Sequence, residues 1–261
     1  MVALNDQLGQ RIPVEFRTCE SFVGFREILD ELTEAARCGQ IPLLHVECHG
    51  DEHAGLIFEN GSELSWQDLA TILTLLNDAS HYNLFAVFAA CFGAHFLGQL
   101  NAFRTPPCFA IVAPTESVYP DEIEAAFKQF YRDLFNGWDA ALAISRLRNR
   151  RLTSGRWFAE TAERWFERVV MAYVETKCTR KEMKPRVRAL YRQLRAKGNR
   201  QSIGWLKRMI NKRNKEVFLD EYFDRFFGTR KFPDNRQRFT GVHQRMKKRL
   251  SDIWCQRQYR P

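Results

Sequence analysis

The sequence predicts an α/β fold: a mostly parallel sheet with helices on both faces, followed by a basic, all-helical extension. Two observations support this prediction. Up to about residue 152, short continuous apolar runs alternate with segments whose apolar residues recur at helical spacing, as expected for a parallel sheet buried on both sides. Beyond that point only helical spacing persists, and Lys and Arg become frequent.

The first elements follow from capping and turn signals. Residues 12–19 read as a short strand, and residues 21–40 as a helix that Ser21 caps. Residues 41–50, IPLLHVECHG, are apolar enough for a buried strand, and Gly50 closes it.

A turn and a second helix precede the central strand. The pair Asn60-Gly61 predicts a short hairpin over 54–64. Residues 65–80 begin with a capping-box-like Ser and Asp and carry a leucine-rich face, so we expect a helix. The run LFAVFAA, 84–90, predicts a buried strand that stops at Cys91.

The alternation of strands and helices continues to about residue 152 and then gives way to helices alone. We expect a helix over about 94–101, a strand over 108–114, and helices over 119–135 and 136–152. After about residue 150 no run is typical of a strand. The four segments that follow are rich in Lys and Arg, with aromatic residues between them, and all four are predicted to be helices. They are 156–176, 185–198, 202–228 and 235–250.

The charge distribution divides the chain in two. Residues 1–145 hold 7 Lys and Arg against 20 Asp and Glu, a net of −13, while residues 146–261 hold 33 against 11, a net of +22. The sum is the overall +9. Such asymmetry indicates two functional units, and we place them at 1–152 and 153–261.

The composition excludes several classes of protein. The first residues lack a basic stretch followed by an apolar one, and no apolar run reaches the roughly 18 residues that span a bilayer. We therefore expect a soluble, cytoplasmic protein that makes no membrane contact. The seven cysteines are odd in number and include no CxxC pair, so a disulfide framework is not expected.

Two predicted strands end in reactive side chains. The strand over 41–50 ends in His49-Gly50, and the strand over 84–90 ends at Cys91. In an open α/β sheet, groups beyond the carboxyl ends of neighbouring parallel strands share one edge. A thiol and an imidazole there make a nucleophile and its acid/base partner, and the Gly50 N–H can point at a developing oxyanion.

These motifs resemble those of the caspase-like (clan CD) cysteine peptidases, most closely their bacterial CHAT branch. The shared features are an apolar strand ending in His-Gly and, about 40 residues later, one ending in Ala-Cys. The stretch CFAIVAPTESVYPDEIEAAFKQFYRDLFNGWDAALAISRLR, 108–148, also looks like the end of a CHAT domain. The likeness covers about residues 12–152 and does not reach the basic part.

The resemblance implies a cysteine endopeptidase. Cys91 would be the nucleophile, His49 the general acid/base, and the N–H groups of Gly50 and Cys91 the oxyanion hole. The reaction would pass through a thioester and need no metal or cofactor. Bacterial relatives act as regulated effectors in antiviral defence or programmed cell death, which implies a peptide or protein substrate and a sensor or activator. AACFGAH lacks the acidic residue that metacaspases place before Cys, so their Arg/Lys pocket is not implied.

Other interpretations of the same residues stay open. Cys91 also suits a buried core thiol. His49 with His53, and Cys91 with His95, have the i, i+4 spacing of metal ligands on a helix, although strand ends do not suit it. Glu47 either orients His49 from the same strand face or lies at a polar edge.

The charged segments also have more than one interpretation. The acidic residues of 50–53 with Glu116, Asp121 and Glu122 either recognise a basic substrate residue or form solvated loops. The basic helices, with interleaved tryptophans, either bind nucleic acid or another acidic partner, dock on the acidic first part, or are solvated. A catalytically silent caspase-like scaffold and a nucleic-acid-binding protein therefore remain as alternative functions.

Overall fold

The structure is a computed structural model that describes residues 13–96, 105–137, 139–153 and 155–258. The chain divides into two compact units. Among the described residues, the first unit comprises those up to Ala162 except Thr105, and the second comprises Thr105 together with the residues from Glu163 onward. Each unit is described by itself.

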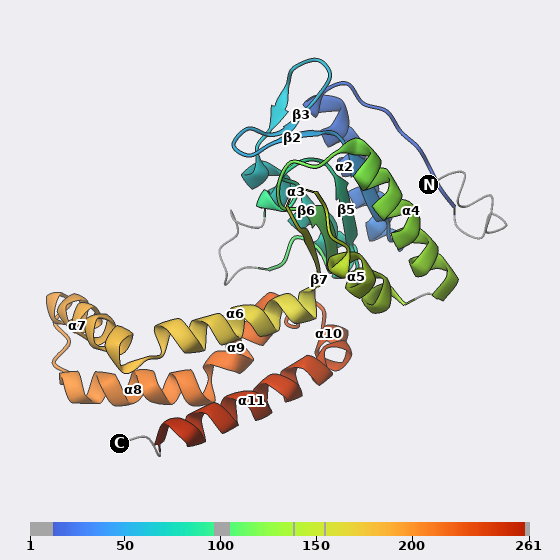
Figure 1. The fold of residues 1–261 in the computed structure, drawn as a ribbon. Helices are drawn as coiled ribbons and strands as arrows, with labels where there is room; N and C mark the ends of the chain where they lie inside the picture. Colours follow the sequence, from blue (N-terminus) through green and yellow to red (C-terminus); the bar gives the residue numbers. More distant parts are fainter. Residues whose placement is uncertain (1–12, 97–104, 138, 154, 259–261) are drawn as a thin grey trace. The chain divides into compact units, whose positions relative to one another are not determined.

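A four-stranded sheet forms the centre of the first unit (Figure 1). Its order is β1 (Leu43–Glu47), β5 (Phe85–Ala89), β6 (Ala110–Pro114) and β7 (Trp157–Thr161). β1, β5 and β6 are parallel, whereas β7 is antiparallel to β6. The expected mixed α/β fold with a mostly parallel sheet is confirmed.

Helices cover both faces of this sheet, and each face has its own apolar core. β5 is buried on both sides, with Phe88 facing one core and Val87 the other. This two-sided burial explains why the strand is continuously apolar. The two layers are α2 (Phe22–Arg37) with α3 (Trp66–Ala79), and α4 (Pro120–Gly137) with α5 (Ala140–Asn149).

A small antiparallel sheet follows β1 directly. It consists of β2 (His49–Asp51), β3 (Gly55–Ile57) and β4 (Glu63–Leu64), and the last two form the expected hairpin. The single strand predicted over 41–50 is therefore divided. The Cys48 N–H still donates to the Ala89 carbonyl at 3.5 Å, and then the chain leaves β5 to pair with β3.

Two further predictions concern residues 12–19 and residues 94–101. The strand predicted over 12–19 is wrong, because residues 13–19 form no regular structure and Phe16 is 76% exposed. A strand needs a hydrogen-bonded neighbour, and residues 13–19 have none among the residues that the structure describes. Most of the helix predicted over 94–101 lies outside the described residues.

The prediction that no strand follows residue 150 is wrong as well. β7 pairs with β6 from Pro114↔Trp157 to Ala110↔Thr161, and its Trp157 and Ala159 are buried in alternation. The alternation is hidden in the sequence because a helix begins immediately afterwards, at Ala162. Trp, Phe, Ala and Glu are also tolerated in helices, so the local signal favoured one long helix.

The second unit is helical around an aromatic core. Phe166, fully buried, contacts the rings of Tyr222, Phe223, Phe226 and Phe227 at centroid distances of 5.2–5.9 Å. None of the described helices is long and apolar enough to cross a bilayer. The helices are α6 (Ala162–Lys177), α7 (Arg180–Ala196), α8 (Ile203–Glu216), α9 (Phe218–Phe226), α10 (Asp234–Arg238) and α11 (Thr240–Gln258).

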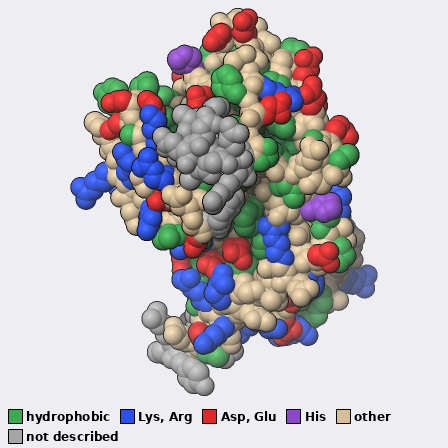
Figure 2. Space-filling model, turned by 90° about the vertical axis from the view of Figure 1, so that its right-hand side faces the viewer, with side chains coloured by type: hydrophobic (Ala, Val, Ile, Leu, Met, Phe, Trp, Pro, Cys, Tyr) green, Lys and Arg blue, Asp and Glu red, His purple; other side chains and the backbone are tan. Residues whose placement is uncertain are grey.

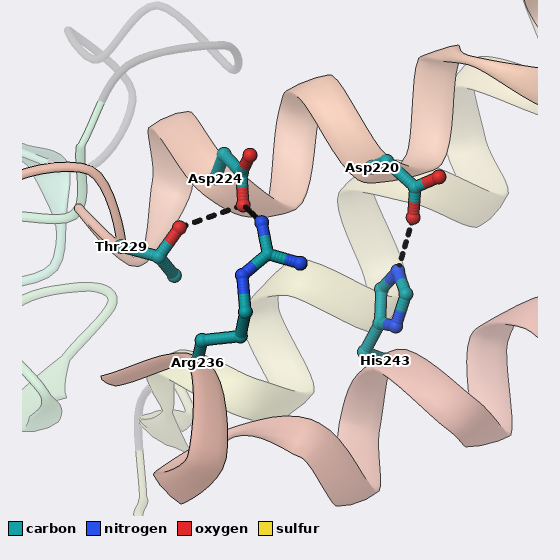
Figure 3. Close-up of polar contacts among 5 residues, drawn as sticks. All are labelled: Asp220, Asp224, Thr229, Arg236 and His243. Carbon is teal, nitrogen blue, oxygen red and sulfur yellow. Dashed lines mark hydrogen bonds and ion pairs between the residues drawn. The ribbon is translucent and has the colours of Figure 1, made fainter. Parts of the chain in front are cut away.

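Polar side chains tie α9 to the last two helices (Figure 3). His243 Nε2 lies 2.6 Å from Asp220 Oδ1. Asp224 accepts the Thr229 hydroxyl at 2.6 Å and forms an ion pair with Arg236. Asp220 and Asp224 of α9 are therefore paired with residues of α11 and α10, which ties these two helices to α9 within the unit.

Candidate functional site

The strand-end Cys and the strand-end His-Gly meet at one edge of the central sheet. β1 and β5 are parallel with Glu47 opposite Ala89, and His49 and Cys91 each follow two residues later. A Cβ atom on Gly50 would lie 2.0 Å from the Cys91 carbonyl oxygen and 3.2 Å from the Cys91 nitrogen. The Gly50 backbone thus packs directly on the Cys91 backbone, and only glycine fits there.

The turn after β5 holds Cys91 at this edge. Phe92 has a left-handed φ of 57°, uncommon for a residue with a side chain, and its N–H donates to the Glu116 carbonyl at 3.1 Å. A Cβ on Gly93 would approach the Ala90 carbonyl oxygen and Phe88 Cβ to 3.0 Å each. The glycine two residues after Cys91 therefore lets the turn fold back tightly on β5.

The Cys91 thiol is half-buried and faces the segment that follows β6. Its Sγ lies 3.6 Å from Ser117 Oγ and 3.8 Å from the Val118 carbonyl oxygen, to which it donates. A thiol in these contacts is accessible but already oriented. It is not the fully buried core thiol of the alternative interpretation, a description that fits Cys108, 1% exposed, whose thiol pKa burial raises well above the usual range.

The His49 side chain is exposed on β2. Its imidazole forms no hydrogen bond, ion pair or ring contact with another residue that the structure describes, Cys91 included. The backbones of the two motifs are therefore in contact, while the imidazole and the thiol are not hydrogen-bonded. The His49 ring is therefore not held by any other residue that the structure describes.

The rings of His45 and His95, in contrast to that of His49, are hydrogen-bonded to neighbouring groups. His45 Nε2 lies 3.1 Å from Glu47 Oε1, and His45 Nδ1 lies 2.6 Å from the Tyr131 hydroxyl. Burial lowers the pKa of His45, opposed by Glu47, and burial also raises the pKa of Tyr131. The neutral ring then donates from Nε2 to Glu47 and accepts from Tyr131.

His95, in the Cys91 turn, is anchored by its Nε2 to the Thr115 carbonyl oxygen at 3.1 Å. Its ring also packs edge-on against Phe92. Glu47, proposed from the sequence to orient His49, pairs instead with His45 and has an exposed side chain. Its role toward His49 stays a prediction that this geometry does not support.

The acidic residues expected near the site serve mainly to hold loops. Asp51 accepts the N–H groups of His53 and Ala54 at 2.8 Å each, and these hydrogen bonds, that of Ala54 first, lower the pKa of Asp51. The Asp51 and Glu52 carbonyls accept the Trp66 indole N–H at 3.0 and 3.2 Å. The loop after Gly50 is thereby fixed to α3.

On the opposite side of the turn, Glu116 contributes its carbonyl to Phe92, while the Glu122 carboxylate accepts the Thr153 N–H at 2.9 Å. Asp121 lies in the first turn of α4. A pocket for a basic substrate residue formed by these carboxylates stays a prediction. An open groove between α2 and α3 is lined by charged residues, but it includes neither Cys91 nor His49. These charged residues are Glu27, Asp30, Glu31, Glu34 and Arg37.

No metal centre is present among the residues that the structure describes, where no group of three or more His, Cys, Asp or Glu side chains is arranged to hold an ion.

Ser117 and Val118 are contacts of Cys91 that the sequence interpretation missed. They follow the carboxyl end of β6, the next parallel strand along the sheet from β5. The rule that placed His49 and Cys91 at the strand ends would also have placed Ser117 there, three residues after Pro114.

Comparison with known proteins gave no match: no family model matches the chain, and no curated protein or solved structure is significantly similar to it.

Proposed function

We propose that the chain is a cysteine endopeptidase of caspase-like type, with Cys91 as the nucleophile and His49 as the general acid/base. The observation that supports this most is the direct packing of the Gly50 backbone on the Cys91 backbone. The backbone contact supports the pairing of a half-buried thiol with an unengaged imidazole, and catalysis would further require the imidazole to come within hydrogen-bond reach of the thiol.

The proposed reaction needs only Cys91, His49 and water, and no cofactor. His49 accepts the Cys91 thiol proton, and the thiolate attacks the carbonyl carbon of a peptide bond. The C–N bond breaks, the amine leaves with the proton from His49, and a thioester remains. A water molecule, deprotonated by His49, then hydrolyses the thioester and returns the thiol. The N–H groups of Gly50 and Cys91 would stabilise the oxyanion in both steps.

In this proposal, the arrangement in which the Cys91 thiol is not hydrogen-bonded to His49 is a resting form of the site. The thiol donates to Val118 rather than to His49, so the thiol, the imidazole or both must reorient before catalysis. Catalytic hydrogen bonds often tighten only when substrate binds. This need for reorganisation suits a regulated bacterial effector in defence or programmed cell death, the role implied by the resemblance to CHAT peptidases. Its partners would be a peptide or protein substrate and a cytoplasmic sensor or activator.

A catalytically silent caspase-like scaffold is the second candidate. The missing hydrogen bond between Cys91 and His49 favours it. In a silent protein the same thiol contacts would serve only to close the turn against the segment after β6. The two candidates differ in one measurable property, the nucleophilicity of Cys91.

The test is labelling by a peptide probe with a thiol-reactive electrophile. We expect labelling of the wild-type chain, no labelling of Cys91→Ala, and a fall of about 10²-fold or more in His49→Ala, where the base is lost. Cys38→Ala is the matched control, because Cys38 is also exposed to reagent, and it should label like wild type.

Labelling that persists in Cys91→Ala would overturn the assignment of the nucleophile. A wild-type chain that reacts at Cys91 no faster than at Cys38, with peptide-resolved mass spectrometry as the readout, would favour the scaffold.

A further inference from the structure

One face of α7 carries a continuous stripe of basic side chains, which we call the α7 stripe: Lys181, Lys184, Arg188, Arg192 and Arg195. Their spacing of three, four, four and three residues keeps them on one side of a helix with 3.6 residues per turn. All five side chains are exposed. With a rise of 1.5 Å per residue, the α7 stripe extends over about 21 Å.

A different face of α7 is used for packing. Met183 and Val187 are buried against Leu206 of α8, with Leu190 and Ile210 packed beside them. The helix pair therefore holds the α7 stripe in place without covering it. The two helices are joined through residues 197–202, which add Lys197 and Arg200, both exposed.

The positive charge of this helix pair is little compensated within the chain. Residues 180–216 contain 14 Lys and Arg against 2 Asp and Glu, a net of +12. Arg195 is hydrogen-bonded to the Tyr191 hydroxyl at 2.9 Å. The other four members of the α7 stripe form no ion pair with any residue that the structure describes.

Such a stripe differs from the charged surfaces of α2 and α4. α2 and α4 pair opposite charges at i, i+4, in Arg26–Asp30 and Glu124–Lys128. The face drawn in Figure 2 likewise shows acidic and basic side chains interspersed. Like charges at i, i+4 destabilise a helix, so the α7 stripe opposes the stability of its own helix unless anions neutralise it.

We propose that the α7 stripe binds the phosphate backbone of a nucleic acid. A line of cations about 21 Å long matches a linear polyanion rather than a single small anion. A membrane surface is disfavoured, because a helix that binds in the interface inserts its apolar face into the lipid. The apolar face of α7 is already buried against α8. This inference does not depend on the proposed peptidase activity.

The test is fluorescence anisotropy of the full chain with single-stranded RNA and with duplex DNA, at about 50 and 200 mM salt. The variant K184Q/R188Q/R192Q removes three charges from the α7 stripe. The matched control K247Q/K248Q/R249Q removes three exposed charges from α11. We expect the stripe variant to bind at least tenfold more weakly and its slope of log affinity against log salt to fall by about 2–3, since each phosphate contact contributes roughly 0.7–0.9.

Equal losses in both variants would overturn the proposal, because binding would then follow net charge rather than the α7 stripe. Wild-type binding to phosphatidylcholine–phosphatidylserine vesicles but to neither nucleic acid would also overturn it. Circular dichroism establishes that both variants keep their helices, and peptide-probe labelling at Cys91 without nucleic acid should stay at the wild-type level in the stripe variant.

Discussion

At the scale of single residues, Gly50 is the position that ties the two halves of the candidate site together. It has an ordinary φ, so glycine is required here by space rather than by backbone conformation. The obstructing atom is the Cys91 carbonyl oxygen, 2.0 Å from the place of a Cβ. Because this is a backbone atom, no side-chain rotation can relieve the overlap.

We expect Gly50→Ala to separate β2 from the Cys91 turn. The overpacking should lower the free energy of unfolding by about 1–3 kcal/mol, measured by urea denaturation, and should slow probe labelling of Cys91. Gly137→Ala is the matched control, since nothing lies within 4 Å of its Cβ position. A Gly50→Ala protein with wild-type stability and labelling would contradict the close packing.

At the scale of elements, β1 and α4 are joined by a polar chain that runs from the exposed Glu47 through the largely buried His45 side chain to the buried Tyr131. It lies on the face of the sheet covered by α4, whose Phe127 also packs edge-on against the His45 ring. Because the imidazole is buried as a neutral ring, its protonation works against folding.

This burial predicts a pH dependence of stability. The folded pKa of His45 is lowered below the unfolded value of about 6.5 by desolvation. The unfolded state therefore binds more protons, and the contribution to stability is full above pH 6.5 and is lost as pH falls toward the lowered pKa. His45→Gln should flatten the decline in unfolding free energy as the pH falls below about 6.5.

The measurement is urea denaturation at closely spaced pH values. His53→Gln, which removes an exposed imidazole from the turn between β2 and β3, should keep the wild-type slope. If His45→Gln retains that slope too, another group is responsible for the acid sensitivity.

At the scale of the whole molecule, the two units have separate cores of different character. The second is dominated by aromatic rings, and Phe227 at its centre stacks on Phe239 at a centroid distance of 4.2 Å. Phe227 is fully buried. Its loss should therefore disrupt one unit rather than weaken the chain evenly.

We expect Phe227→Ala to lower the stability of the second unit by about 3–5 kcal/mol, the usual cost of such a cavity. Hydrogen exchange should accelerate in α6 and α9, while β5 and β6 keep their protection. Met209→Ala, at a side chain that is 39% exposed, should change the exchange of neither unit. Equal acceleration in β5 and α9 would mean that both units unfold together.

Much of the element order was predictable because its signals are local. Capping of α2 by Ser21 and of α3 by Ser65, and the Asn60-Gly61 turn, each depend on residues a few positions apart. The contact between the two strand ends was predictable in outline, since buried apolar strands of an α/β fold are parallel and end at one edge. β7 was missed because its partner, β6, is remote in sequence.

The sequence by itself determined most of the helices and the three parallel strands, and that His49 and Cys91 each follow one of these strands closely, because these features follow from periodicity and local chemistry. Tertiary structure decided which backbone hydrogen bonds each segment completes. It divided 41–50 between two sheets, added Trp157–Thr161 to the central sheet, and directed the Cys91 thiol to Ser117 and Val118. The physical reason is that a strand or a half-buried thiol is completed only by groups that folding brings close to it.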